Sequence, residues 1–166
     1  MTIEFDITLT PRDMYRFNMY QTYSGFHGWF SIVVSVLIFV VAYTTRARVE
    51  TVYTVLYVLF GVLFLVYLPV TLLLRSKHSI AASEVLSRPL HYAVGEEGFA
   101  VTQGEEGAKL PWNQIYKMVA TKSNVLVYSN RINAYVIPRE QLGDKYEELA
   151  ALAKRQLPGY RVKIRG

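Results

Sequence analysis

Two long runs of apolar residues dominate the first half of the chain. Residues 26–43 and residues 52–74 carry no Asp, Glu, Lys or Arg. At a rise of 1.5 Å per residue these runs would form helices about 27 and 34 Å long, and the hydrocarbon core of a bilayer is about 30 Å thick. The pattern therefore predicts two transmembrane helices, the second of them tilted or emerging into the headgroups.

Two other interpretations account for these runs less well. A buried helix of a soluble protein rarely extends so far without a charge, because one of its faces usually meets water. A cleavable signal peptide would begin close to the first residue, whereas about 25 mostly polar or amphipathic residues precede the first run, with Glu4, Asp6 and Asp13 among them. We therefore expect both runs to be membrane spans.

Residues 44–51 join the two predicted spans. So short a link requires an antiparallel hairpin, which places both chain ends on one side of the membrane. Near the membrane, that side carries five basic residues against Arg46 and Arg48 in the link: Arg12, Arg16, Arg75, Lys77 and Arg88. The positive-inside rule then favours cytoplasmic termini, with the two link arginines as a counter-signal.

The two predicted spans contain few side chains that could take part in transport or catalysis. Ion and proton pathways usually need an ionisable side chain inside the membrane, which both spans lack, so a pump or a transporter is disfavoured. Ser31 and Ser35 form a small-xxx-small pair that could bring helices together, and a homo-oligomer is one outcome of such a contact. Pro69 is expected to bend the second span.

A different pattern precedes the first span. Residues 2–9 alternate strictly between polar and apolar side chains, which is typical of a half-buried strand. Thr10, Pro11 and Asp13 then form a helix-start signature, which predicts a helix lying along the membrane surface as far as Gly25. Because a lone strand is unstable in water, the C-terminal half must supply the sheet that this strand joins.

Short alternating segments follow the second span. Residues 77–87 contain good helix formers and are expected to continue that span as a helix until Arg88 and Pro89. Six strands are then predicted, over residues 90–94, 99–102, 108–112, 115–121, 124–128 and 134–137. Residues 139–156 have apolar positions at a spacing near 3.6 and are predicted to form one amphipathic helix. The basic tail, residues 160–166, fits either an edge strand or a tether to anionic lipid.

These elements together predict an α+β membrane protein. The six strands and the N-terminal strand that joins them make seven. Seven strands capped by one C-terminal helix are the outline of a pleckstrin-homology-like (PH-like) barrel or sheet. The expected domains are residues 1–24, a strand and an interfacial helix; residues 25–74, the transmembrane helical hairpin; and residues 75–166, a cytoplasmic linker helix with the PH-like domain.

Several short motifs resemble the YcxB-like family of bacterial membrane proteins. The most specific are the Leu-Pro-Trp-x-x-Ile-x-Lys element that begins at Leu110 and the Tyr-x-Ile-Pro-Arg element that begins at Tyr135. Further matching stretches are residues 5–10, 17–20, 90–92 and 97–99. The resemblance implies two transmembrane helices and a cytoplasmic domain with a PH-like fold. It implies no activity and no catalytic residue, since the family has no agreed function.

Residues suited to catalysis or metal binding are sparse. The chain has no Cys, and its three histidines, His27, His78 and His91, lack the spacing of a metal site. No nucleophile elbow, Walker loop or dinucleotide fingerprint occurs. The two Gly-Glu-Glu-Gly segments, which begin at Gly95 and Gly104, fit solvated hairpin turns better than a cation or phosphate site. We therefore expect a non-enzymatic protein without a cofactor or a metal.

Basic and aromatic residues supply the remaining candidates. Arg75 and Lys77 could contact anionic lipid headgroups, at about 1 kcal/mol each, or could act only as topology determinants. Trp112 is either a core side chain or a ligand-facing ring. The net charge of +5 does not indicate nucleic-acid binding, because acidic residues interleave with the basic ones.

Three functional hypotheses follow from the sequence. The first is an inner-membrane protein whose cytoplasmic domain binds a protein partner or lipid headgroups. The second is a membrane immunity protein that protects against a pore-forming or membrane-targeted toxin, which would then be its partner. The third, an enzyme or a transporter subunit, would need a cluster of polar groups assembled in three dimensions.

Overall fold

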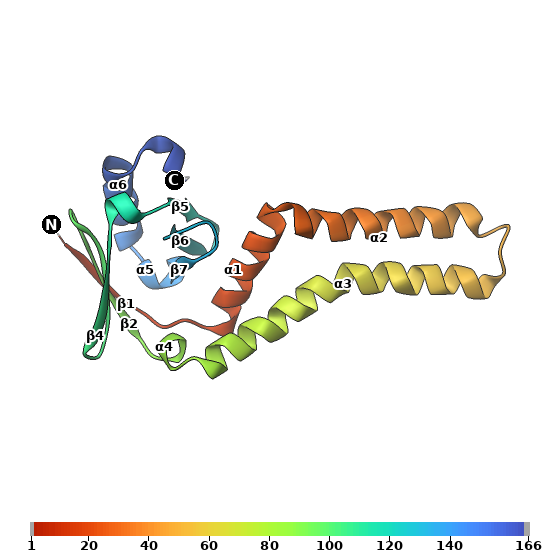
Figure 1. The fold of residues 1–166 in the computed structure, drawn as a ribbon, viewed down its shortest axis with the longest axis horizontal. Coiled ribbons are helices and arrows are strands. Elements are labelled where there is room, and N and C mark those ends of the chain that lie inside the picture. Colours follow the sequence, from red (N-terminus) through yellow and green to blue (C-terminus); the bar gives the residue numbers. More distant parts are fainter. Residues whose placement is uncertain (1, 165–166) are drawn as a thin grey trace. The chain divides into compact units, whose positions relative to one another are not determined.

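The structure, a computed structural model, describes residues 2–164 and, within them, every side chain except that of His27 (Figure 1). The expectations for the His27 side chain and for residues 165 and 166 of the basic tail lie outside the described residues. The chain forms two compact units. We call Met1–Phe17 with His78–Gly166 the sheet unit, and Asn18–Lys77 the hairpin unit.

The first sheet of the sheet unit joins the start of the chain to its second half. It contains β1 (Ile3–Ile7), β2 (Leu90–Gly95), β3 (Gly98–Gln103) and β4 (Glu106–Pro111), all antiparallel and in that order. The alternate residues of β1 are buried, and Ile7 pairs with Leu90. The prediction that the N-terminal strand joins a sheet from the C-terminal half is confirmed.

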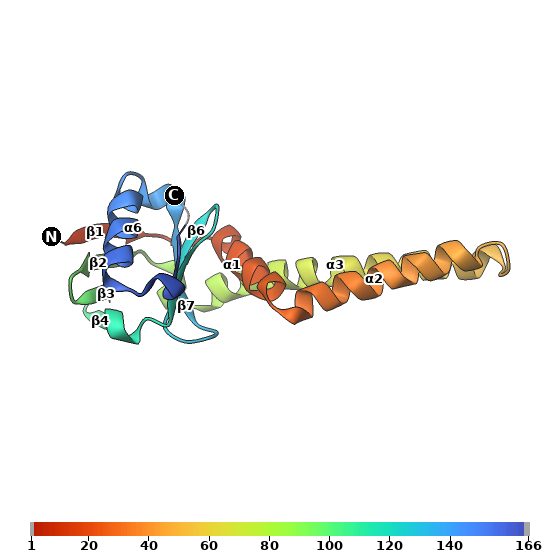
Figure 2. The ribbon, with the colours of Figure 1, turned by 90° about the horizontal axis from the view of Figure 1, so that it is seen from above.

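The second sheet has the order β7-β6-β5-β8, and Figure 2 shows its strands β6 and β7 opposite the first sheet. Its strands are β5 (Lys117–Ala120), β6 (Asn124–Tyr128), β7 (Ala134–Pro138) and β8 (Val162–Lys163). The described part of the basic tail therefore forms an edge strand, β8, which runs parallel to β5. All five residues of β6 are buried, so this strand is covered on both faces.

Of the predicted barrel or sheet, the described residues form no closed barrel but two separate four-stranded sheets. The sheets part between β4 and β5. Pro111 ends β4 and has no N–H for a ladder hydrogen bond. The chain then turns through η1 (Trp112–Gln114), so β5 begins two residues later than predicted and cannot continue the first sheet.

The C-terminal helical segment is also divided. It forms α5 (Arg139–Leu142) and α6 (Lys145–Gln156) in place of the single predicted helix. The break lies at Gly143, whose φ of +53° and ψ of −130° are accessible to glycine and strained for other residues. The predicted apolar face is nevertheless confirmed, because every member is buried: Leu142, Tyr146, Leu149, Leu152 and Ala153.

Three helices supply the hairpin unit: the end of α1 (Pro11–Ser24), all of α2 (Phe26–Thr45) and α3 (Thr51–Ala82) up to Lys77. Both α2 and α3 are long and apolar enough to cross a membrane. Helix α3 continues past the predicted span, as expected, but ends at Ala82. Ser83 then caps the separate helix α4 (Glu84–Ser87) by accepting a hydrogen bond from the Leu86 N–H.

Small residues allow α2 and α3 to approach each other closely. The Ser31 Oγ donates to the Phe64 carbonyl at 2.8 Å, and the Ser35 Oγ donates to the Gly61 carbonyl at 2.7 Å. A Cβ at Gly61 would lie 2.6 Å from a ring carbon of Phe39, so any larger residue there would have to displace that ring. The small-xxx-small pair therefore serves the contact within the hairpin.

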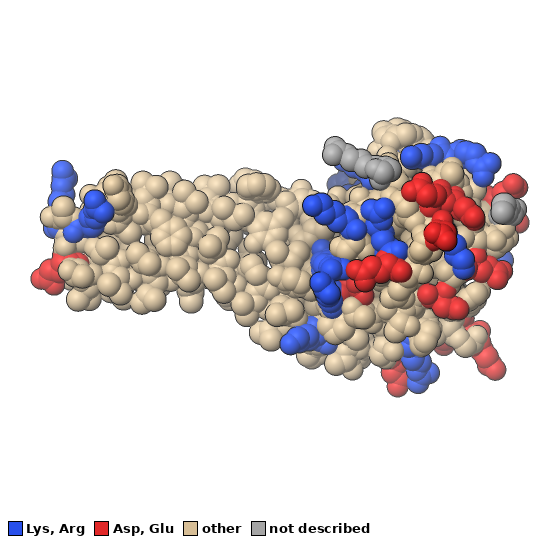
Figure 3. All heavy atoms as spheres, turned by 180° about the vertical axis from the view of Figure 1, so that it is seen from behind, with Lys and Arg blue, Asp and Glu red and all other residues tan. Residues whose placement is uncertain are grey.

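Most of the remaining surface of α2 and α3 is apolar and exposed. The exposed fractions of Phe26, Leu37 and Leu63 are 77 %, 58 % and 59 %. Figure 3 shows a long stretch of surface without charged side chains, with Lys, Arg, Asp and Glu atoms at its tip. Soluble monomers rarely expose so large a continuous apolar surface.

Candidate binding cavity

A cavity of about 570 Å³ lies between the two sheets of the sheet unit. One side is formed by the inner face of the first sheet, including Tyr92, Val101 and Ala108. The other side is formed by the first three residues of β7, Ala134 to Val136. Its volume falls within the range of about 300–1,000 Å³ that is usual for ligand sites.

The strand register explains which side chains reach the cavity. Ala108 of β4 pairs with the buried Val101 of β3, and Lys109 pairs with Ala100. Because neighbouring side chains of a strand point to opposite faces, Ala108 faces inward and Ala100 faces outward. A small residue at position 108 therefore leaves room where a larger side chain would fill the space.

The segment after α3 closes one end of the cavity, with Val85 in its lining. The Gln103 side chain holds this segment in place, since its Nε2 donates to the carbonyl oxygens of Val85, Arg88 and Pro89 at 2.9, 3.3 and 3.3 Å. One amide thus ties α4 and its following turn to the end of β3.

Carboxylates border this end of the cavity. Glu106 lines it, and an adjoining surface hollow shares Val85, Gln103 and Glu106 with it and adds Glu84, Arg88 and Glu105. We call Glu84, Glu105 and Glu106 the acidic rim. Glu84 pairs with Arg88 at 3.6 Å, whereas no ion pair of Glu105 or Glu106 occurs among the described residues. The rim is therefore negatively charged.

Tyr92 stays neutral at the inner wall. Its ring stacks on Phe5 with the centroids 5.4 Å apart, and its side chain is almost fully buried. Burial, and secondarily the charge that Tyr135 would carry, raise the pKa of the Tyr92 phenol above its ordinary value. The Tyr92 phenol therefore keeps its proton over the whole physiological pH range.

The described residues contain no cluster of three or more His, Asp or Glu that could hold a metal ion. The cavity lining instead combines aliphatic and tyrosine side chains with a few hydroxyl and amide groups, among them Thr102, Ser129 and Asn133. Such a lining suits the binding of an apolar group with polar contacts at its edge.

Comparison with known proteins points to the segment that forms most of this cavity. Residues 94–153 match the model of the family described as YcxB-like protein. This part of the chain belongs to the YcxB-like family. Neither a curated protein nor a solved structure matches the chain. The YcxB-like segment extends from the end of β2 into α6, so it includes both β4 and β7.

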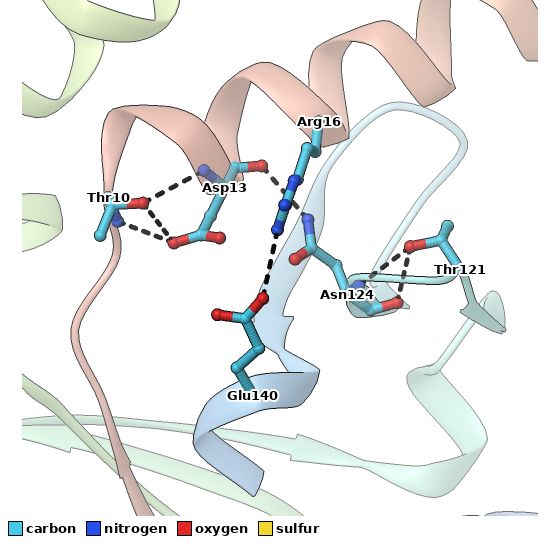
Figure 4. Close-up of polar contacts among 6 residues, drawn as sticks. All are labelled: Thr10, Asp13, Arg16, Thr121, Asn124 and Glu140. Carbon is cyan, nitrogen blue, oxygen red and sulfur yellow. Dashed lines mark hydrogen bonds and ion pairs between the residues drawn. The ribbon is translucent and has the colours of Figure 1, made fainter.

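The YcxB-like segment also holds the first turns of α1 against the second sheet (Figure 4). Thr10 and Asp13 cap the helix reciprocally, as the sequence predicted: the Thr10 N–H donates to Asp13 Oδ2 at 3.1 Å, and the Asp13 N–H donates to Thr10 Oγ1 at 3.3 Å. The Asn124 Nδ2 of β6 donates to the Asp13 carbonyl at 3.2 Å. Arg16 approaches Glu140 of α5 at 3.9 Å.

Sequence reasoning missed the role of Asn124, which it treated only as the first residue of a strand. Asn124 is 1 % exposed, and its Oδ1 has no hydrogen-bond partner among the described residues. An asparagine at the start of an otherwise apolar strand is the signal that could have revealed a buried contact.

The predicted headgroup residues lie in the hairpin unit. Arg75 and Lys77 are exposed on α3, on either side of the buried Ser76. The Ser76 Oγ accepts a hydrogen bond from the Asn18 Nδ2 at 2.9 Å and donates to the Leu72 carbonyl at 2.7 Å. The cavity, by contrast, is lined only by residues of the sheet unit.

Two further sequence candidates have structural roles. Trp112 is 6 % exposed, and its Nε1 donates to the Gly95 carbonyl at 2.9 Å, so of its two possible roles the structure shows the core side chain. The His91 Nδ1 contacts Asp6 Oδ1 at 2.7 Å across the β1–β2 pair, at the surface. His78 is an exposed residue of α3.

Proposed function

We propose that this chain is a non-enzymatic protein of the bacterial inner membrane whose sheet unit binds a protein partner in the cavity between its two sheets. The cavity is the observation that carries the binding role, because it combines an apolar lining with a charged rim in the YcxB-like segment. The hairpin is the membrane anchor in this proposal, and both termini lie in the cytoplasm.

The apolar surface of α2 and α3 supports the membrane location. Lipid tails can cover exposed side chains such as Phe30, Leu37 and Leu63 without the free-energy cost of hydrating them. The short link between the helices and the excess of basic residues near the chain ends support cytoplasmic termini. Arg75 and Lys77 would then meet anionic headgroups at the cytoplasmic surface, at about 1 kcal/mol each.

A PH-like relationship is part of the same proposal. Two four-stranded sheets, antiparallel except for the β5–β8 pair, and a C-terminal helix support it, although the sheets do not close into a barrel. Protection against a membrane-targeted toxin remains the alternative role. In that case the partner in the cavity would be the toxin itself.

Single cysteines test the membrane part of the proposal, because the natural chain has none to interfere. Ala47→Cys places a thiol in the link of the hairpin, and Lys154→Cys places one on α6. A membrane-impermeant maleimide applied to intact spheroplasts should label the first variant at once and the second only after permeabilisation. Labelling of Lys154→Cys in intact spheroplasts would exclude the proposed topology.

A photoreactive residue tests the binding part. We expect p-benzoylphenylalanine in place of Tyr135, an aromatic residue that already lines the cavity, to form covalent adducts with one protein in living cells. The same residue at position 100, on the outer face of the first sheet, is the control and should give none. Equal adducts from both positions, or none from position 135, would contradict a partner in the cavity.

A further inference from the structure

The four outer strands of the two sheets differ in how their edges are protected. Natural sheets usually guard an exposed edge with charged residues or with a very short strand. Here β1 carries Glu4 and Asp6, β4 carries Glu106 and Lys109, and β8 is only two residues long. Strand β7, Ala134–Pro138, contains no charged residue. Among the described outer strands longer than two residues, it is the one without a charged side chain, and its Pro138 protects only the end of the strand.

The unguarded strand borders the cavity. Ala134, Tyr135 and Val136 of β7 all line it, and β4, the outer strand of the other sheet, lines it as well. Ala134 and Tyr135 are half-buried, whereas Val136 and Ile137 are buried. Strand β7 thus has a neighbouring strand on one side only, and its start lies beside an apolar hollow, which is the arrangement that binds extended peptides by strand addition.

The charge of the rim indicates what kind of segment fits. Glu105 and Glu106 would repel an anionic lipid headgroup or a fatty-acid carboxylate, whereas they would attract Lys or Arg. Arg88 is already paired with Glu84, and Arg131, on the same loop as Ser129 and Asn133, lines neither hollow. The electrostatics thus favour a cationic polypeptide over an anionic lipid.

We propose that an extended segment of the protein partner adds to the edge of β7 as a further strand. Its apolar side chains, at alternate positions, enter the cavity beside Val101 and Ala108, and a Lys or Arg side chain lies against Glu105 and Glu106. This inference rests on the proposed binding function and specifies its ligand: a segment in which apolar and basic residues alternate.

Three short peptides test this inference with the full chain in micelles of a neutral detergent. The first alternates Val and Lys over seven residues, the second has Glu in place of Lys, and the third is the Val-Lys peptide N-methylated at every peptide bond. All carry a fluorescent dye, so that binding is measured by anisotropy. The N-methylated peptide keeps the charge but cannot complete a strand ladder, which controls for partition into the micelle.

We expect saturable binding of the Val-Lys peptide, with at least tenfold weaker binding of the other two. Ala108→Trp should abolish binding by filling the cavity, whereas Ala100→Trp, on the outer face, should leave it unchanged. Glu105→Lys together with Glu106→Lys should reverse the preference between the Lys and Glu peptides. These two surface substitutions keep the test decisive if Ala108→Trp fails to fold.

Three results would overturn strand addition: equal binding of the N-methylated peptide, no effect of the charge reversal, or saturable binding of phosphatidylglycerol to the wild-type chain but not to Ala108→Trp. The last result would identify a lipid as the occupant. If the peptides fail while a protein still cross-links from position 135, the binding function stands and only strand addition is lost. Loss of that cross-link would contradict the proposed function itself.

Discussion

Trp112 shows how one residue of the YcxB-like segment joins several parts of the sheet unit. Its ring meets Phe99 edge-on with the centroids 5.3 Å apart, and its indole N–H satisfies the carbonyl of Gly95. The side chain therefore links the turn after β4 to β2 and β3. Removing it would leave both a void and an unpaired carbonyl.

We expect Trp112→Ala to lower the free energy of unfolding of the sheet unit by about 3–5 kcal/mol. The measurement is hydrogen exchange of the β3 and β4 amides in the full chain, followed by mass spectrometry. Tyr160→Ala is the control, because Tyr160 is 76 % exposed and its loss should change stability by less than about 0.5 kcal/mol. Equal exchange in the two variants would show that the indole does not stabilise the core.

Tyr92 gives the fold a dependence on alkaline pH. A phenol in the unfolded chain loses its proton near pH 10, whereas burial raises the pKa of Tyr92 in the folded chain. The stability that neutral Tyr92 contributes to the fold is therefore complete below about pH 10, and it is lost as the pH rises towards the pKa of Tyr92 in the folded chain. The melting temperature of the wild type should fall more steeply above about pH 10 than that of Tyr92→Phe. The same slope in both chains would contradict this, and Tyr160→Phe is the exposed control.

At the scale of elements, two polar contacts that hold α1 against the second sheet differ in strength. Asn124 is buried, so its hydrogen bond to the Asp13 carbonyl is shielded from water. Arg16 and Glu140 are separated by 3.9 Å, and the Glu140 side chain is 82 % exposed. Solvent screening leaves such an exposed ion pair little free energy.

Asn124→Ala should therefore release the start of α1 much more than Glu140→Ala. We expect the free energy needed to open the start of α1 to fall by about 1–2 kcal/mol in the first variant and by about 0–0.5 kcal/mol in the second. Hydrogen exchange of the amides at residues 13–17 measures both. If Glu140→Ala gave the larger increase in exchange, the ion pair would be the main attachment of α1.

Elements with strong local periodicity could be predicted from the sequence, and contacts between distant segments could not. The alternation of residues 2–9 predicted a strand, and the structure pairs Ile3–Ile7 with β2. Gly143 divides the C-terminal helix although the apolar spacing continues across it. Periodicity reports burial, whereas a break depends on backbone angles that the same pattern does not encode.

The candidate site was harder to predict than the fold. Leu110 and Trp112 were recognised as a motif, yet the cavity forms from β7, β4 and α4, which are separated in the sequence. Nothing local shows that β4 and β7 remain outer strands, because strand order is a property of the whole sheet. The sequence could thus identify the YcxB-like segment without revealing the hollow that it lines.

At the scale of the whole molecule, the proposed membrane location depends on the apolar surface of the hairpin. An arginine at the centre of a span costs about 2.5–3.5 kcal/mol of insertion. Leu63→Arg, and equally Leu37→Arg, should therefore reduce the amount of chain in the membrane fraction several-fold. Leu63→Ile is the matched control and should leave the yield unchanged. Membrane yield equal to that of the wild type in the arginine variants would contradict the proposed spans.

The close approach of Gly61 to the ring of Phe39 has a consequence for how this chain can change over time. A bulkier side chain at position 61 would meet that ring, so it requires either a shift of the ring or a smaller residue at position 39. Substitutions at the two positions are therefore coupled, and among homologues a larger residue at position 61 should accompany a smaller one at position 39.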